Sequence, residues 1–426
     1  MPVLLPVPHP RPAALTAAWH ERRVLWAANP ALGALTTLAP LGPPIVRAPK
    51  LGWLVRDPVL IRRILIDHRS TSVLGEGGVG HLWAQLLGDW VLDLFDGAGH
   101  HGLRTRARDL FTEARAHHLV QSAAGDLLTR LTGRLRDRQT VDVADAARVL
   151  VGLLVAQMLG LDLDRFREPA AAAGLDRSGS GPDEFGPHRW LFHRGEQLAA
   201  LAIGTQTDTG LSAETVRRGR EILTELTADV PSHFRDAPPD TVLGRARTLG
   251  ISEQEATGLS CLLLVAGTET AASGIARTLA LLADTGSARR LGAATGQDRA
   301  ELVEQAVREG LRVTTPAPLI GRHITRDLQV GGRTLRAGER VLCLVHPANT
   351  RPGGFDLERP YLPENRQLWF GAGRHLCLGA PVAREELRRM IGAVAEAGPW
   401  QVVAREPARH VLIPTYRRLL LRADPP

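Results

Sequence analysis

Cysteine is scarce in this chain. The 426 residues include 3 cysteines, at Cys261, Cys343 and Cys377. A disulfide framework needs more than this, so the composition excludes the disulfide-rich secreted class and favours a reducing compartment. We therefore expect a cytoplasmic protein.

Lysine is scarcer still, and long apolar runs are lacking. Lys50 is the single lysine, so almost all of the net charge of +7 comes from arginine, interleaved with 45 acidic residues. This pattern argues against a nucleic-acid-binding protein with a dedicated basic tail. Apolar runs such as residues 262–266 fall far short of the roughly 20 residues that span a bilayer. The first eight residues also lack the pattern of a signal peptide, so we expect no membrane anchor.

Helical patterning dominates the sequence. It runs from about residue 123 to 282, with short β-like runs near both ends of the chain. Residues 44–48 and 52–56 predict a hairpin, followed by a helix from Pro58, and residues 328–330 and 340–345 predict further strands.

The sequence shows neither repeats nor a linker long enough to separate domains. Residues 177–182 and 237–240 are expected to be loops between helices. The apolar fraction of 44% can form a large core. We therefore predict one mainly α-helical domain with small β-sheets over residues 1–426, in which residues 1–40 form an N-terminal segment.

Glycines surround Cys377 in residues 370–379, Phe-Gly-Ala-Gly-Arg-His-Leu-Cys-Leu-Gly. They permit a tight loop that presents one thiolate away from bulky neighbours. A lone free cysteine is most often a small buried apolar residue. The glycine spacing, the basic pair before the cysteine and the helical residues 380–385 instead favour a ligand loop for a flat metal cofactor. A thiolate ligand to haem iron favours cleavage of the O–O bond.

A long helix is predicted over residues 252–285. Ser252 and Glu255 form a capping box, and no proline interrupts the segment, so roughly thirty residues could cross the whole domain. Its centre is apolar enough to be buried, yet it contains Glu269. An ionised glutamate there costs about 2–4 kcal/mol unless it is paired, hydrated or protonated.

Ala266 and Gly267 remove side-chain bulk just before Glu269 and Thr270. A mid-helix glycine followed by threonine invites a local bulge or kink. Such a break could open a groove for a small diatomic molecule beside an acid–alcohol pair. The alternative is a core helix whose glutamate reaches a solvent pocket.

Two further pairs have helical spacing. Glu309 and Arg312 lie three residues apart, which alone would indicate a surface ion pair of a few tenths of a kcal/mol. His100 and Arg104 lie four residues apart and could present two donors to one anion, such as a haem propionate. The alternative for the second pair is a basic solvated helix face.

Together these motifs resemble the cytochrome P450 monooxygenases. Residues 370–379 resemble the family's haem-binding signature, Phe-Gly-x-Gly-x-His-x-Cys-x-Gly. Residues 266–270 resemble its oxygen-binding motif Ala-Gly-x-Glu/Asp-Thr, residues 309–312 its Glu-x-x-Arg element, and residues 100–104 its propionate helix. The motifs occur in the family's order, over about residues 40 to 422. The resemblance implies the P450 fold, one haem b and a monooxygenase activity.

The resemblance also implies a role for each matching residue. Thr270 would stabilise iron-bound peroxide, and Glu269 would relay protons to it. Cys377 would bind the iron. The remaining cofactor contacts would come from Phe370, His100, Arg104, Arg322 and His375. The structural pair Glu309–Arg312 would be braced by Arg359, with Arg366 as the rival. One departure is Gln367, where the family often has a histidine, so one propionate is expected to be held differently.

The positions that would contact substrate are mostly apolar, which indicates an apolar or weakly polar ligand. They are Leu86, Val265, Ala266, Leu319 and Ile320. The arginine bias and the resemblance to short bacterial P450s suggest tailoring of natural products. The implied reaction inserts one atom of O₂ into an organic substrate. Alternatives are oxidative coupling, desaturation or rearrangement in the same fold, or a haem-binding accessory protein without turnover.

Electrons are expected from a ferredoxin and a ferredoxin reductase, because the chain leaves no room for a flavin domain. Basic surface near the cysteine side of the haem would suit an acidic ferredoxin. The arginines expected there are Arg104, Arg106, Arg108, Arg374, Arg384 and Arg388.

Overall fold

The computed structural model describes residues 12–75, 79–88, 90–97, 99–175, 184–203 and 210–425. The helices of this part are α1 (Pro12–Ala28), α2 (Pro30–Leu38), α3 (Pro58–Ile66), α4 (Val79–Leu87), α5 (Trp90–Phe95), α6 (His100–Arg108), α7 (Glu113–Arg136), α8 (Val143–Leu159), α9 (Arg167–Ala172), α10 (Gly186–Ile203), α11 (Ala213–Thr227), α12 (Val230–Asp236), α13 (Val242–Thr248), α14 (Glu253–Ala266), α15 (Thr268–Asp284), α16 (Ser287–Ala293), α17 (Gly296–Thr314), α18 (Val345–Thr350) and α19 (Ala380–Glu396).

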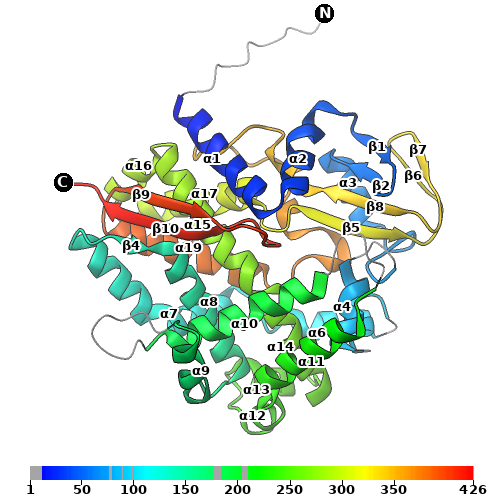
Figure 1. The fold of residues 1–426 in the computed structure, drawn as a ribbon, viewed down its shortest axis with the longest axis horizontal. Helices are drawn as coiled ribbons and strands as arrows, with labels where there is room; N and C mark the ends of the chain where they lie inside the picture. The colour runs from blue at the N-terminus through cyan, green and yellow to red at the C-terminus, as the bar shows by residue number, and fades with distance from the viewer. Residues whose placement is uncertain are drawn as a thin grey trace, which may run out of the picture.

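The strands form small sheets beside this helical body (Figure 1). They are β1 (Ile45–Ala48), β2 (Gly52–Val55), β3 (Thr71–Ser72), β4 (Val141–Asp142), β5 (Leu319–Ile324), β6 (Leu328–Val330), β7 (Arg333–Leu335), β8 (Arg340–Leu344), β9 (Trp400–Pro407) and β10 (Tyr416–Ala423). Five strands pair in the order β1-β2-β8-β5-β3, three in the order β4-β10-β9, and β6 pairs with β7. The predicted mainly α-helical class with small sheets is confirmed.

Local sequence signals account for several of these boundaries. The predicted hairpin is present as β1 and β2, which pair antiparallel with Ile45 opposite Val55. The predicted helix after it is α3, where the Asp57 side chain accepts the backbone N–H groups of Val59 and Leu60 as an N-cap. The loop predicted at residues 237–240 lies between α12 and α13. The loop predicted at residues 177–182 lies outside the described residues.

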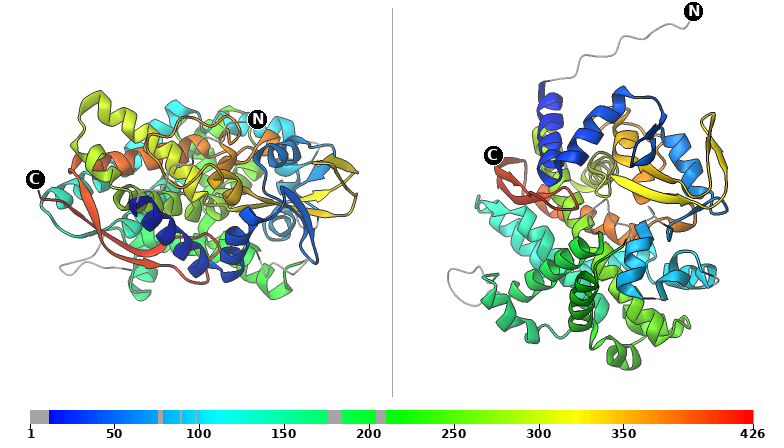
Figure 2. Two further views of the ribbon diagram at one scale, coloured as in Figure 1. Left: turned by 90° about the horizontal axis from the view of Figure 1, so that it is seen from above. Right: turned by 45° about the vertical axis from the view of Figure 1, so that its right-hand side comes forward.

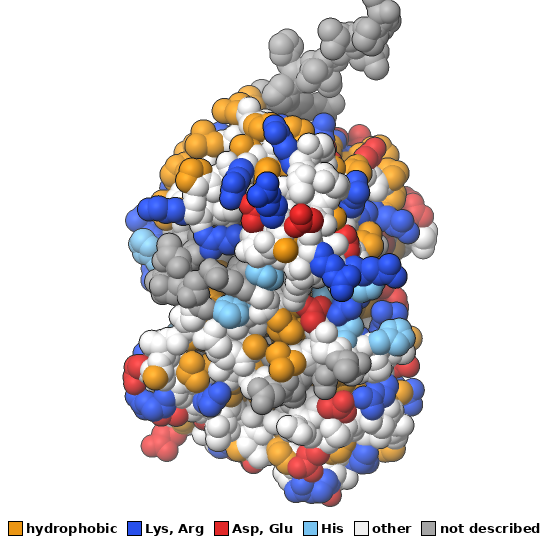
Figure 3. Space-filling model, turned by 90° about the vertical axis from the view of Figure 1, so that its right-hand side faces the viewer, with side chains coloured by type: hydrophobic (Ala, Val, Ile, Leu, Met, Phe, Trp, Pro, Cys, Tyr) orange, Lys and Arg blue, Asp and Glu red, His pale blue; other side chains and the backbone are white. Residues whose placement is uncertain are grey.

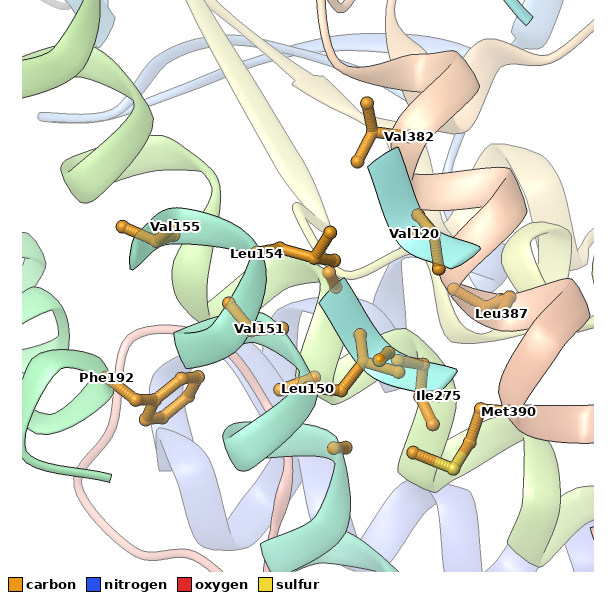
Figure 4. Close-up of a cluster of buried hydrophobic side chains, with 14 of the residues drawn as sticks. Val120, Leu150, Val151, Leu154, Val155, Phe192, Ile275, Val382, Leu387 and Met390 are labelled. Atoms are coloured by element: carbon orange, nitrogen blue, oxygen red, sulfur yellow. The ribbon is translucent and has the colours of Figure 1, made fainter. Parts of the chain in front are cut away.

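The main core forms where the long helices meet. Figure 4 shows Val120 of α7, Leu150 and Leu154 of α8, Ile275 of α15 and Leu387 of α19 packed together. All five are fully buried. Because α15 contacts α8, α17 and α19, this helix runs through the interior, as the two views of Figure 2 also indicate.

The segment Glu253–Asp284 combines α14 and α15. By length and composition it could cross a membrane, but 72% of its most apolar window is buried inside the fold. Such burial is typical of a core helix, as the sequence predicted. The capping box at its start is also present, since Ser252 and Glu255 each bond the other's backbone.

Candidate active site

The loop before Cys377 is shaped by two glycines in the left-handed backbone region. Gly371 has φ +78° and Gly373 has φ +69°, values that other residues rarely adopt. A Cβ on Gly373 would lie 2.9 Å from the Cα of Ile66, so glycine lets the loop pack directly on α3. The backbone N–H of Cys377 donates to the carbonyl of Phe370 at 2.9 Å. This bond closes the loop and sets the direction in which the cysteine is presented.

The Cys377 sulfur lies in a positively polarised environment. Burial raises the pKa of its thiol, while the backbone N–H of Gly379 and the guanidinium groups of Arg104 and Arg384 lower it. The positive end of α19, which begins at Ala380, is also close. The residue is nevertheless exposed, so it is accessible to a ligand. These features suit a thiolate that binds a metal.

The central helix is interrupted at Gly267. Helix α14 ends at Ala266, and α15 begins at Thr268. A Cβ on Gly267 would lie 2.7 Å from the carbonyl oxygen of Leu263, so only glycine fits there without a shift. The Thr270 hydroxyl donates to the carbonyl of Ala266 at 3.0 Å. The break expected from the sequence is therefore present, with the threonine hydroxyl directed at it.

Glu269 sits beside this break in a desolvated position. Burial, with a smaller effect from the carboxylate of Glu196, raises the pKa of its carboxyl to about 8, although the backbone N–H of Ile413 opposes the rise. Its Oε2 atom is buried and has no hydrogen-bond partner among the described residues. The carboxyl is therefore mostly protonated near neutral pH and can donate a proton.

The four basic residues expected at the propionates belong to one cluster. The rings of His100, on α6, and His375, in the cysteine loop, lie 5.2 Å apart. Burial, together with the charges of Arg374, His375 and Arg104, lowers the pKa of His100 to about 4, although a hydrogen bond with the Leu94 carbonyl opposes the shift. Burial and the charge of Arg322, on β5, also lower the pKa of His375. At neutral pH the arginines therefore carry the positive charge of the cluster.

Glu309 and Arg312 form a buried ion pair on α17. The Arg312 Nε lies 2.7 Å from Glu309 Oε2, and both side chains are 3% exposed. Arg359 Nε lies 3.1 Å from Glu309 Oε1. Arg312 also donates to the carbonyls of Gly353 and Gly354 at 3.0 and 2.8 Å. The structure thus brings Arg359 to the pair, whereas the rival candidate, Arg366, accepts a bond from Arg62 through its carbonyl.

Comparison with known proteins identifies the family. A family model described as Cytochrome P450 matches residues 240–401. Cytochrome P450-SU2 from Streptomyces griseolus is 38% identical over 353 residues, which cover 79% of this chain and 77% of that protein. The chain belongs to the cytochrome P450 family.

Two further comparisons extend this result. The 20-oxo-5-O-mycaminosyltylactone 23-monooxygenase of Streptomyces fradiae is 34% identical over 166 residues, which cover 37% of this P450 and 38% of that protein. The crystal structure of CYP109B1 from Bacillus subtilis matches with a TM-score of 0.69 at 22% identity, over 93% of this chain and 100% of that chain. The structural likeness supports the P450 fold. The protein is a P450 monooxygenase, and its family implies a haem-iron cofactor.

The residues of this P450 fit a haem. The loop supplies a sulfur donor, and the basic cluster supplies cations for carboxylates. Among the described residues, the buried His375 Nδ1 and Trp83 Nε1 have no hydrogen-bond partner. Such polar atoms are costly unless a partner is present. A flat cofactor with a central metal and acidic side groups would satisfy both the sulfur donor and the basic cluster.

Asp96 is a member of the P450's basic cluster that the sequence reasoning missed. Its carboxylate accepts from the hydroxyl of Ser72 at 2.6 Å and from Arg374 at 2.7 Å, and it lies 3.3 Å from His375 Nε2. Burial alone would raise the pKa of Asp96, but hydrogen bonds from His375 and Ser72 hold it well below its usual range. Asp96 lies between α5 and α6, so helical spacing gave no signal for it. Asp96 orients His375 and holds Arg374, which is one of the arginines expected at the surface.

Gln367 faces the cysteine side of the site. Its Oε1 atom accepts a hydrogen bond from Arg384 at 3.2 Å, and Arg384 also lies over the ring of Phe370. This glutamine therefore helps to place one of the two arginines that act on Cys377.

The residues expected at the substrate differ in their surroundings. Ile320 lies close to Gly371 of the cysteine loop, and Leu319 is partly buried on the same strand. Val265 and Ala266 lie on α14 at the break. Leu86 is 1% exposed, and a Cβ on Gly219 would lie 2.2 Å from its Cδ1. Leu86 therefore packs against α11 and is not among the residues proposed to contact the substrate.

Helix α10 adds a polar element that the sequence reasoning missed. A Cβ on Gly195 would lie 2.7 Å from Cγ2 of Thr268, so glycine lets α10 pack directly on the oxygen-motif helix. Glu196, the next residue, is close enough to raise the pKa of Glu269. The surroundings of the acid–alcohol pair are therefore not purely apolar.

Proposed function

We propose that this P450 binds haem b through Cys377, with His100, Arg104, Arg322 and His375 at the propionates. We also propose that it forms a single domain, acts in the cytoplasm and receives electrons from a ferredoxin and its reductase. Cys377 and the basic cluster share their surroundings, since the charge of Arg104 lowers the pKa of both Cys377 and His100. This proximity supports the cofactor assignment. When bound, the haem supplies activation of O₂ and transfer of an oxygen atom.

The protein's own contribution is to place a proton donor and a hydroxyl at the helix break. The Glu269 carboxyl is held neutral by burial, so it can release a proton when one is consumed nearby. The Thr270 hydroxyl bonds the Ala266 carbonyl and can pass a proton onward, because a hydroxyl both donates and accepts. The pairing of a protonated acid with a hydroxyl at the break is the observation that carries the monooxygenase assignment.

The proposed substrate is an apolar or weakly polar organic molecule, and the proposed setting is bacterial natural-product tailoring. Val265, Leu319 and Ile320 supply apolar contacts, and Glu196 and Glu269 supply the polar ones. The Streptomyces fradiae relative, named for a mycaminosyltylactone, supports the tailoring role.

Labelled dioxygen tests this proposal. The haem-loaded protein would be incubated with ferredoxin, reductase, NADPH and ¹⁸O₂, against a panel of macrolactones, steroids and cyclic peptides. We expect one ¹⁸O atom in the product of at least one compound. A product that is coupled, desaturated or rearranged without the label would instead assign this chain to the alternative oxidative chemistries.

A further inference from the structure

A fully buried arginine lies on the helix that carries Thr270. Arg277 is 0% exposed and sits two helical turns after Thr270. A buried guanidinium is costly unless its donors are paired. Its Nε lies 3.3 Å from Glu21 Oε2, and its Nη2 contacts Glu21 Oε1. Its Nη1 donates to the Ser273 hydroxyl at 3.3 Å and to the Pro414 carbonyl at 3.2 Å.

These contacts join three segments that are far apart in sequence. Glu21 lies on α1, and Pro414 lies in the loop between β9 and β10, referred to here as the hairpin loop (residues 408–415). Helix α1 contacts both α15 and β9, and Figure 1 shows it beside the hairpin. The Ser273 hydroxyl also donates to the Pro414 carbonyl at 2.6 Å. The backbone N–H of His410 donates to Ala27 of α1 at 3.2 Å. The hairpin loop is thus held between α1 and α15.

The hairpin loop also reaches the proton donor. Ser273, whose hydroxyl bonds the Pro414 carbonyl, lies one helical turn after Glu269 on α15, so the loop lies along the helix face that carries Glu269. The backbone N–H of Ile413, directly before Pro414, also lowers the pKa of the Glu269 carboxyl. Contacts therefore run from Glu21 through Arg277 and Pro414 to Ile413 and Glu269. Both ends of this chain of contacts lie on or against the central helix, so a shift of Pro414 would move the Ile413 amide relative to the carboxyl.

A second ion pair already ties the same elements together. Arg405 of β9 makes two bonds to Asp284 at the end of α15, at 2.6 and 2.7 Å, and His20 of α1 lies 2.9 Å from the same carboxylate. This cluster joins α1, α15 and the hairpin without touching the hairpin loop's tip. It therefore ties the same elements together independently of Arg277.

We propose that Arg277 is a positioning residue for the oxidation reaction. Through Pro414 it fixes the hairpin loop so that the Ile413 amide holds the Glu269 carboxyl in the orientation needed for proton delivery, and Glu21 fixes Arg277. Arg277 does not touch the reacting atoms. The inference rests on the proposed role of Glu269 as the proton donor.

The test uses mild variants of the haem-loaded protein. Arg277→Leu would leave Glu21 buried without a partner and destabilise the fold, so Glu21→Gln and Ser273→Ala are preferred. The matched control is Asp284→Asn, which weakens the second cluster between the same elements. Two quantities are measured: hydrogen exchange of the hairpin loop, and the rate of product formation with the panel compound that gives the largest ¹⁸O-labelled product.

We expect exchange in the hairpin loop to rise by about tenfold in both variants, because the loop opens locally. The rate of product formation (kcat) should fall severalfold at unchanged haem content, with a smaller change in KM. Asp284→Asn should lower thermal stability without either effect.

Unchanged loop exchange in Glu21→Gln would overturn the proposal. It would also be overturned if the loop loosened but the rate of product formation held while Glu269→Gln lowered that rate, because the loop would then position nothing. If the rate held in Glu269→Gln as well, the proton role of Glu269 itself would fail, and the positioning role would fall with it.

Discussion

Cys377 differs from the other two cysteines in what surrounds its sulfur. Cys343 is fully buried, and burial raises its pKa to about 12; for Cys261 the value is about 11. At Cys377 an amide and two arginines oppose the effect of burial. We expect the reduced, carbon monoxide-bound protein to show the red-shifted Soret band of thiolate ligation. Cys377→Ala should lose that band, whereas Cys343→Ala should keep it. A spectrum of histidine ligation in the unaltered protein would refute the assignment.

Thr270 and Glu269 lie next to each other, but substitutions of the two residues should have different effects on the reaction. Thr270→Ala removes the hydroxyl at the break, so we expect haem content and NADPH consumption to persist while hydrogen peroxide replaces product. Glu269→Gln removes the proton source and keeps the hydroxyl, so the whole cycle should slow, by roughly 10²–10⁴-fold if no other donor substitutes. The ratio of product to NADPH measures the difference. Full coupling in Thr270→Ala would mean that the proton arrives by another route.

Glu386 on α19 is a buried acid with no role in the proposed chemistry. Burial alone raises its pKa from the ordinary value of 4.5 to about 8. Because the folded-state pKa is the higher one, its neutral form contributes stability below about pH 4.5, and that contribution is lost as the pH rises to about 8. Glu386→Gln should therefore gain stability relative to the unaltered protein between pH 5.5 and 8, by on the order of a few kcal/mol. Urea unfolding at both pH values measures this. The exposed Glu364→Gln is the control and should show no such trend.

At the scale of the element, the Glu309–Arg312 pair fixes α17 to the segment that leads to the cysteine loop. Arg312 bonds the carbonyls of Gly353 and Gly354, and the backbone N–H of Asp356 donates to Glu309 at 3.0 Å. Removing one partner leaves the other charge buried, at about 3–5 kcal/mol. Glu309→Ala or Arg312→Ala should therefore abolish folded holoprotein. Arg359→Ala should cost less, because its side chain is 18% exposed. Stable, haem-loaded Arg312→Ala protein would contradict this role.

The same elements show which features could be predicted from sequence. Glu309–Arg312 and His100–Arg104 lie within single helices, where spacing alone places two side chains on one face. Gly267 could be predicted as a helix break because glycine is costly in a helix interior. Asp96 and the Glu21–Arg277 pair depend on segments that meet only in the folded chain. No periodicity links residues 256 positions apart, so these contacts had to come from the structure.

At the scale of the whole molecule, the basic surface expected to receive a ferredoxin is largely neutralised within the chain. Arg106 pairs with Glu255, Arg374 with Asp96, Arg384 with Glu113, and Arg388 with Glu304 and Glu385. Figure 3 shows the same intermixing of basic and acidic side chains over one face of the molecule. Arg104 bonds the carbonyl of Leu376. Of the arginines expected at this surface, Arg108 alone is exposed and has no ion pair among the described residues.

Arg108 lies one helical turn beyond Arg104 on α6, so the two share a helix face. Arg104 is close enough to Cys377 for its charge to lower the pKa of that thiol. Arg108 therefore lies at the outer side of the region where electrons are expected to enter. We expect Arg108→Glu to raise the KM for an acidic ferredoxin by about 3–10-fold at low salt, with little change in kcat, since surface charge acts mainly on encounter. The effect should shrink as ionic strength rises. Arg333→Glu, on the β6–β7 hairpin, makes the same charge change elsewhere and is the control. Equal effects of the two substitutions would mean that the net charge of the molecule, and not this site, guides the partner.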